Sequence, residues 1–451
     1  MNNTKSVNLS SLTEKRTLSG EIWDILWPII LITIVKKLGA GFEGILVSAK
    51  SAEELAITSI CEPYTKMLTT ISYGLGIAMN SIIGRASRDG VWIRSGRAIV
   101  KFSIILVLIF GYGMSVISVF LLRPSLALSG IKASLAWSYM MPYLLCSPIL
   151  LLYSMLMAAM RGLGNAKAGL KMTLISVPVN LLLTYVLYTC FGLGMLSWGY
   201  ILSQVAGTIY AIYICSENIH TEGTDPLPKG FVRQFLVLAV PLSLTKMVAP
   251  GGNAAINALI LTFGREYVAA TGLTARLEAY FYLCAMSMGS VAVTLVSRAE
   301  HGRDMKELAK ALCLWSLVPT VVTTAAGYLL KDQMWQILTK DPAVQSAGIL
   351  YWSIALFAYP FIALEMTTTG ILQAYGLGVP MLIITAIRTW GVQLGSAWLA
   401  VKFGLGVEFA WWGYVAGNVT AFLISLVWAW IKIKGEKNEH QFNSRGSAQG
   451  N

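Results

Sequence analysis

The sequence predicts an all-α membrane protein with twelve transmembrane helices, arranged as two pseudo-symmetric six-helix bundles that are parallel repeats of each other. Three observations predict this fold: the composition, the apolar segments, and a repeat that relates the two halves of the chain. Of the 451 residues, 56% are hydrophobic and only 12% are charged, and that charged fraction is about half that of a soluble domain. So few charges cannot cover a water-exposed surface of this size, and lipid must therefore surround much of the chain.

Apolar segments long enough to cross a bilayer occur twelve times. A transmembrane helix needs about 20 mostly apolar residues, whereas the strands of a membrane barrel are about 10 residues long and alternate in polarity. The long runs in this chain therefore predict helices. The predicted spans are residues 22–48, 53–83, 98–122, 134–160, 168–190, 195–215, 234–262, 266–297, 309–330, 345–373, 379–402 and 407–433.

The basic residues predict the orientation of these spans. If the N-terminus is inside, 21 of the 34 Lys and Arg residues fall in internal stretches and 7 in external ones. This threefold excess predicts that both termini are cytoplasmic in a multi-pass protein of the inner (plasma) membrane. Because the basic residues lie in short connections and not on one soluble face, we expect a lipid bilayer and no nucleic acid as partner. We also expect a monomer that binds a small-molecule substrate.

The second half of the chain repeats the first at an offset of about 213 residues. Paired residues include Pro28 and Pro241, Gly76 and Gly289, Arg85 and Arg298, and the motifs FGLG and WGY each occur twice, at 191–194 and 403–406 and at 198–200 and 412–414. Six helices per half give both halves the same orientation, as in transporters built from parallel repeats. The predicted divisions are a cytoplasmic tail (1–20), an N-lobe (21–215), a cytoplasmic linker (216–233), a C-lobe (234–433) and a disordered cytoplasmic tail (434–451).

Three segments resemble one family of transporters. They are LWPIILITIVKKLGAGFEGILVSAKSAEELA at 26–56, RGLGNAKAGLKMTLISVPVNLLLTYVL at 161–187 and VAATGLTARLEAYFYLCAMSMGSVAVTLVSRAEHGRD at 268–304. They are similar to helix 1, the segment linking helices 4 and 5, and helix 8 of the multidrug and toxic compound extrusion (MATE) family, in the MOP flippase superfamily. The resemblance covers about residues 20–430. It implies export of organic compounds by sodium or proton antiport.

Glu43 is the first candidate for ion coupling. It stands where the family usually has an Asp, seven residues after Lys36 and on the same face of the predicted helix. A carboxylate inside a membrane usually faces a cavity or a partner, and one that exchanges protons as access alternates would couple ion and substrate. The alternative is an ion pair with Lys36 or Lys37 that only stabilises the first helix.

Polar residues on helices 5 and 6 are the expected partners of Glu43. Asn180 matches the family's Asn, whereas Thr184 stands where many members have a second Asp, and both lie on one helix face. These oxygens could hold sodium, but one negative charge fewer favours protons as the coupling ion. Ser203 and Gln204 are further candidates for the same pocket.

Other charged residues inside the spans are candidates for the substrate cleft. Glu62 and Lys66 have the i, i+4 spacing of a local pair, Glu365 and Arg388 could pair between helices 10 and 11, and Arg276 and Glu278 point to different faces. The full set is Lys36, Lys37, Glu62, Lys66, Lys246, Arg276, Glu278, Glu365 and Arg388. With Glu43, six cations and four carboxylates leave a surplus of two positive charges, which raises the hypothesis of an anionic, zwitterionic or amphipathic substrate.

Two prolines and six cysteines complete the candidates. Pro28 and Pro241 lie early in helices 1 and 7, where each predicts either a hinge or a static kink. The cysteines are scattered singly, so neither a disulfide framework nor a metal site is indicated.

The leading functional hypothesis is therefore a secondary antiporter for an organic small molecule, without a cofactor. A flippase for a lipid-linked saccharide or another amphipathic anion remains an alternative within transport. A non-transporting membrane enzyme or scaffold is the alternative from another class. The chain has no nucleotide-binding loop, HExxH motif or nucleophile elbow, which argues against an enzyme.

Overall fold

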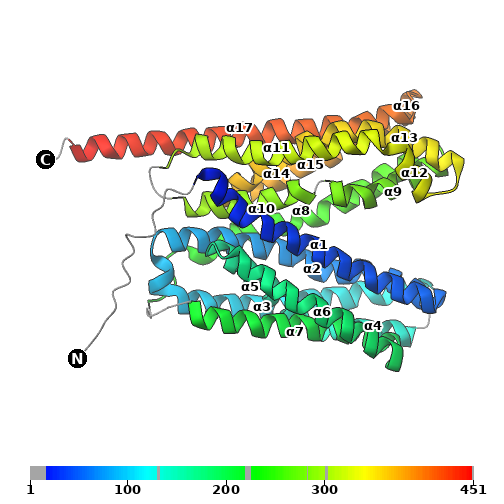
Figure 1. Ribbon diagram of the computed structural model, residues 1–451, viewed down its shortest axis with the longest axis horizontal. Helices are drawn as coiled ribbons and strands as arrows, with labels where there is room; N and C mark the ends of the chain where they lie inside the picture. Colours follow the sequence, from blue (N-terminus) through cyan, green and yellow to red (C-terminus); the bar gives the residue numbers. More distant parts are fainter. Residues whose placement is uncertain (1–16, 130–132, 219–224, 282, 300–302, 449–451) are drawn as a thin grey trace.

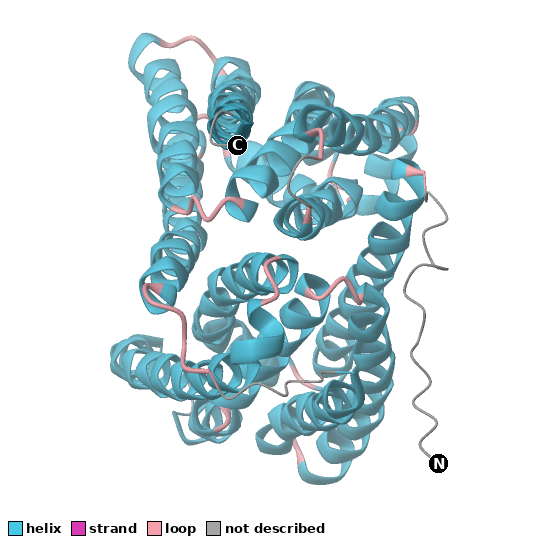
Figure 2. Ribbon diagram, turned by 90° about the vertical axis from the view of Figure 1, so that its left-hand side faces the viewer, coloured by secondary structure: helices cyan, strands magenta, loops and turns pink. Residues whose placement is uncertain are grey.

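The computed structural model describes residues 17–129, 133–218, 225–281, 283–299 and 303–448, and every regular element in these ranges is a helix. The first half of the chain forms one group of helices and the second half another (Figures 1 and 2). The first group, called the N-lobe below, comprises α1 (Leu18–Lys50), α2 (Ala52–Arg88), α3 (Val91–Ser129), α4 (Ala133–Leu145), α5 (Ser147–Gly162), α6 (Ala166–Phe191) and α7 (Leu193–Asn218).

The second group, called the C-lobe, begins after the connection between the halves. Its elements are α8 (Phe231–Ile260), α9 (Arg265–Phe281), α10 (Leu283–Arg298), α11 (Met305–Leu329), α12 (Lys331–Leu338), α13 (Pro342–Ala355), η2 (Leu356–Ala358), α14 (Tyr359–Ala374), α15 (Val379–Ala386), η3 (Ile387–Gln393), α16 (Leu394–Phe403) and α17 (Val407–Ala448).

The helices account for the twelve predicted spans. Within the described ranges, eight segments are long and apolar enough to cross a membrane, and the bent pairs α4–α5 and α9–α10 bring the number to ten. The helix α7 and the continuous run α15–η3–α16 coincide with the other two predicted spans, 195–215 and 379–402. Four predicted spans thus contain a break or a change of helix type, because α13 and α14 are also separated by the short 3₁₀ turn η2.

The bend of 47° between α4 and α5 has a chemical cause. Pro148 has no amide hydrogen, so the carbonyl of Leu144 loses its helical donor. The hydroxyls of Ser115 and Ser147 donate to this carbonyl instead, at 2.8 and 3.3 Å. A bilayer offers no water to such a group, so these hydroxyls make the break tolerable at membrane depth.

The C-terminal part of the chain differs from the sequence prediction. The polar composition after residue 434 predicts a disordered tail, but α17 continues as a helix to Ala448. The predicted boundary at residue 434 therefore falls inside α17, and residues 449–451 lie outside the described residues. Most of the predicted tail 1–20 and residues 219–224 of the predicted linker also lie outside them.

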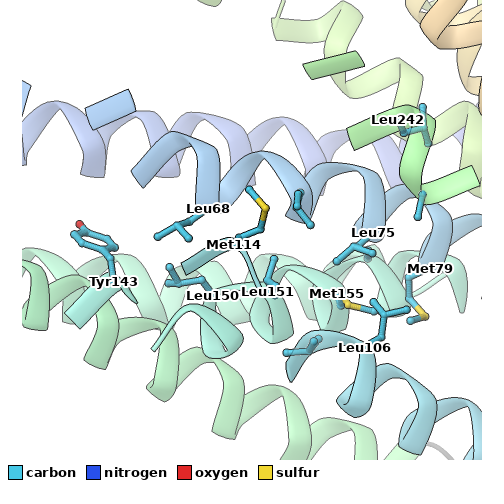
Figure 3. Close-up of a cluster of buried hydrophobic side chains, with 14 of the residues drawn as sticks. Leu68, Leu75, Met79, Leu106, Met114, Tyr143, Leu150, Leu151, Met155 and Leu242 are labelled. Atoms are coloured by element: carbon cyan, nitrogen blue, oxygen red, sulfur yellow. The ribbon is translucent and has the colours of Figure 1, made fainter. Parts of the chain in front are cut away.

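The largest buried cluster joins α2, α3 and α5 (Figure 3). Leu68, Leu75 and Met79 of α2 face Leu106 and Met114 of α3, and leucines of α5 fill the space between them. Leu242 of α8 belongs to the same cluster. The N-lobe core is therefore continuous with the first helix of the C-lobe.

The lobes meet at the end of the bundle where α1 begins and α17 ends (Figure 1). Asn80 of α2 donates a hydrogen bond to the Thr294 hydroxyl of α10 at 3.1 Å, and the Ser81 hydroxyl donates to carbonyls at the end of α14. At the 213-residue offset of the repeat, Asn80 corresponds to Val293, the residue before Thr294. We call this contact region the seam.

The accessibility of α2 changes along its length. Glu62, Lys66, Thr69 and Tyr73 are exposed at helical spacing, whereas the residues from Gly74 to Gly84 are almost all buried. A row of exposed polar side chains on a membrane helix indicates a water-accessible face and not a lipid-facing one. The polar row therefore ends where the seam begins.

Candidate functional site

Glu43 lies beside a cavity of about 420 Å³ in the N-lobe. Three helices besides α1 line this cavity: α2 with its polar row, α4 and α7. The lining residues are Glu43, Gly44, Val47, Thr58, Glu62, Thr65, Lys66, Thr69, Tyr139, Tyr143 and Tyr200. Glu43 is half-buried, so its carboxyl group borders the cavity and the protein interior at once.

Three tyrosines surround the Glu43 carboxyl group. The Tyr139 hydroxyl donates a hydrogen bond to it, and the Tyr143 hydroxyl donates to the oxygen of Tyr139. The ring of Tyr143 lies 5.6 Å from that of Tyr139 and 5.8 Å from that of Tyr200. Phenols that donate to a carboxylate stabilise its charged form. The tyrosines can therefore stabilise the Glu43 carboxylate without a paired cation.

The lysines of α1 do not pair with Glu43. The Lys36 ammonium lies 3.7 Å from the Met157 sulfur of α5 and 5.2 Å from the ring centre of Tyr153. Seven residues separate Lys36 from Glu43 by about 10 Å along the helix axis, which is more than the two side chains bridge. Among the described residues, no ion pair involves Glu43, so an ion pair within α1 is not formed.

The other predicted coupling residues lie behind the cavity. The Thr184 hydroxyl donates to the Asn180 side-chain oxygen at 3.0 Å, and both residues are buried on α6. On α7, Ser203 donates to the Tyr200 carbonyl at 2.6 Å, and Gln204 is buried. None of these side chains is among the residues that line the Glu43 cavity.

Two lysines reach across from one lobe to the other. Lys37 of α1 lies 4.6 Å from the ring centre of Tyr280 on α9, and Lys246 of α8 lies 4.3 Å from that of Tyr73 on α2. Each contact is a cation–π interaction.

The carboxylate of Glu62 pairs with Lys66 at 2.5 Å at the edge of the Glu43 cavity. Both side chains are more than half exposed.

Two carboxylates of the C-lobe, Glu278 and Glu365, are enclosed. Glu278 is 7% exposed and accepts a hydrogen bond from the Tyr414 hydroxyl at 3.1 Å. Glu365 pairs with Arg388 at 3.3 Å between α14 and η3, with side-chain exposures of 5% and 18%. Arg276, two residues before Glu278, is exposed, so these neighbours point to different surroundings.

Pro28 and Pro241 both lie inside continuous helices, α1 and α8. The Thr245 hydroxyl donates to the Pro241 carbonyl at 2.8 Å. A hinge at either proline stays a prediction.

Sequence reasoning missed the tyrosines. Tyr200 borders the Glu43 cavity and Tyr414 donates to Glu278, and both are the last residue of the repeated WGY motif. That repeat was the available signal, because a polar aromatic residue at the same place in both halves indicates a shared internal position. Tyr139 and Tyr143 carry no such signal.

Comparison with known proteins gives one family and several relatives. The MatE family model matches residues 28–186 and again 241–399. The chain is 24% identical over 413 residues to the probable multidrug resistance protein YpnP of Bacillus subtilis, covering 87% of this chain and 90% of that one. It is 23% identical over 397 residues to an FAD transporter of Shewanella oneidensis, covering 81% of each. Among solved structures, a crystal structure of MATE in the bent conformation superposes with a TM-score of 0.83 at 20% identity, over 94% of this chain and 97% of that one.

Proposed function

The chain belongs to the MatE family, and from this membership we propose that it is a secondary active transporter, not an enzyme, that exports an organic small molecule. In this proposal the exporter is a monomer in the inner membrane that needs no cofactor. Protons move inward as substrate moves outward, and the two lobes expose the binding region to each side in turn.

Glu43 carries this proposal. It is a half-buried carboxylate at a cavity, held by a phenol and paired with no cation among the described residues. A carboxylate that loses contact with water binds a proton more readily, and one that regains water releases it. Closing and opening the cavity therefore changes the proton occupancy of Glu43, which couples proton movement to access.

The composition of the site favours protons over sodium. Sodium needs several oxygen ligands, but the amide of Asn180 and the hydroxyl of Thr184 bond to each other. The other carboxylate at the cavity, Glu62, is already neutralised by Lys66. One carboxylate with a phenol is sufficient for a proton.

The distribution of basic residues supports cytoplasmic termini. In that orientation the seam lies at the cytoplasmic end, and the Glu43 cavity lies in the outer half of the N-lobe. The conformation described here then corresponds to an outward-facing state.

Transport in proteoliposomes tests this proposal. The purified protein is reconstituted, a proton or a sodium gradient is imposed, and movement of fluorescent dyes is followed for wild type, Glu43→Gln and Glu62→Gln. Glu62 is the matched control because it lines the same cavity but is ion-paired and exposed. We expect proton-driven transport in wild type and Glu62→Gln and none in Glu43→Gln. Transport that follows only the sodium gradient, or that survives in Glu43→Gln, contradicts the proposal.

The substrate stays open within this function. The relatives carry different names, a multidrug resistance protein and an FAD transporter, so family membership leaves the substrate class undecided. A lipid-linked saccharide flippase remains the second candidate, because cations lie at membrane depth in both lobes.

A further inference from the structure

Two cations lie inside the N-lobe on facing helices, apart from the Glu43 cavity. Lys36 of α1 contacts Met157 and the ring of Tyr153, both on α5. Arg161 follows Met157 by one helical turn, so it lies on the same face of α5. The charges of Lys36 and Arg161 are close enough to repel each other.

No carboxylate neutralises this pair. In the described part of the chain, the ion pairs join Lys66 to Glu62, Arg88 to Asp89, Arg303 to Glu21 and Arg388 to Glu365, and none includes Lys36 or Arg161. The Nε of Arg161 is buried without a hydrogen-bond partner. Two like charges without a counter-ion inside a membrane protein are costly, and a bound anion would remove that cost.

Lys36 is the accessible member of the pair. The Tyr153 ring, the Met157 thioether and the Ser176 hydroxyl beside it are buried, and the hydroxyls of Tyr153 and Ser176, 3.0 Å apart, bond to each other. Lys36 itself remains exposed, so an entering molecule can reach its ammonium group.

We propose that Lys36 and Arg161 form a binding site for the anionic group of an organic anion, such as a carboxylate, sulfonate or phosphate. The inference rests on the proposed export function and names the substrate class of that exporter. The guanidinium binds the oxyanion through two parallel N–H donors, whereas the ammonium acts as a point charge.

Equilibrium binding of fluorescein, an aromatic dianion, tests the site. The full-length protein is placed in nanodiscs of zwitterionic phosphatidylcholine, and binding is measured by fluorescence anisotropy for wild type, Lys36→Gln, Arg161→Gln and Arg161→Lys. Lys37→Gln is the matched control, since Lys37 is the adjacent residue but lies against Tyr280 of the C-lobe. Ethidium serves as the cationic probe.

We expect Kd for fluorescein to rise about tenfold or more in Lys36→Gln and in Arg161→Gln, to recover partly in Arg161→Lys, and to stay unchanged in Lys37→Gln. Ethidium should bind each of these variants at least as tightly as it binds wild type. Fluorescein affinity within twofold of wild type in Lys36→Gln overturns the inference, and this variant decides the question alone if Arg161→Gln does not fold.

Two further arms separate the sources of the anion and the two proposals. Competition by anionic phosphatidylglycerol would identify a lipid headgroup as the natural anion, whereas its absence favours a free molecule, and both outcomes support an anion site. Glu43→Gln should fail to transport fluorescein. If Glu43→Gln transports like wild type, the coupling proposal fails and the anion site stands; if only ethidium is transported, the anion site fails and the exporter stands.

Discussion

The two lobes each hold a carboxylate against the tyrosine of a WGY motif, but they give it different access to water. Glu43 borders a cavity of about 420 Å³ near Tyr200, whereas Glu278 is 7% exposed beneath Tyr414. We infer that the N-lobe carboxylate is placed for exchange with water and the C-lobe carboxylate for packing. The charges of the C-lobe should therefore contribute to stability, and those of the N-lobe to transport.

The two carboxylates are not repeat equivalents. At the 213-residue offset, Glu278 corresponds to Thr65, which lines the Glu43 cavity, and Glu43 corresponds to Ile256. Each lobe thus supplies one carboxylate to a similar interior region, but from a different helix. The two lobes therefore share a fold, but their carboxylates lie at different positions of the repeat.

The largest expected effect is on transport. Glu43→Gln should reduce proton-driven dye movement to the level of empty liposomes, because an amide cannot exchange a proton. Glu278→Gln should retain most of the wild-type rate, because the amide oxygen still accepts from Tyr414. Initial rates under an imposed pH gradient measure both. Equal losses in the two variants would remove the distinction between the lobes.

A buried ion pair gives the next largest effect, on stability. Glu365→Ala should lower the free energy of unfolding by about 3–5 kcal/mol, because it leaves Arg388 charged and unpaired. The double substitution Glu365→Leu with Arg388→Met should regain most of that loss. Unfolding in mixed detergent micelles measures both, and a double variant as unstable as Glu365→Ala would argue for a role beyond pairing.

Removing single phenol hydroxyls sharpens the comparison. Tyr414→Phe takes a donor from the enclosed Glu278 and should cost about 1–3 kcal/mol of unfolding free energy, with transport retained. Tyr139→Phe takes a donor from Glu43 beside the cavity, so it should cost less stability and change the pH dependence of transport. Melting curves and rate profiles against pH distinguish the two. The reverse assignment of effects would contradict our inference.

The smallest effect is expected for the exposed pair at the cavity edge. Glu62→Gln should change the free energy of unfolding by about 0–1 kcal/mol, because exposed ion pairs contribute little. Transport should stay near the wild-type rate. A loss of transport without a loss of stability would place Glu62 in the coupling machinery with Glu43.

The sequence predicted the twelve spans and the two-lobe repeat, and these are confirmed. The two segments matched by the MatE model start at 28 and 241 and end at 186 and 399, which is the same 213-residue offset. Apolar length and Lys/Arg placement follow from the bilayer itself, so they can be seen without a structure. The bend at Cys146 could not be predicted from length, because residues 134–160 are apolar enough for one span. In the sequence, only Pro148 indicated this bend.

The candidate site was predicted less completely. Glu43 could be selected because a carboxylate within a span usually faces a cavity or a partner. The identity of its neighbours, however, depends on how α4 and α7 pack against α1. The sequence therefore could not show Tyr139 and Tyr143. It also suggested that Asn180 and Thr184 belong to the Glu43 pocket. The two bond to each other on α6, and their part in ion coupling stays a prediction.

The seam has a geometric consequence. Asn80 touches Thr294, which directly follows Val293, the repeat equivalent of Asn80, and a contact between nearly equivalent residues lies close to the rotation axis that relates the halves. Contacts beside that axis come in duplicate: a methyl group at Gly376 would meet Arg85, and one at Gly164 would meet Arg298. Separating the lobes at this end must break both copies of each contact together. The free energy of each contact therefore enters the barrier to opening twice. A substitution in one half of the chain alone removes only one of the two copies.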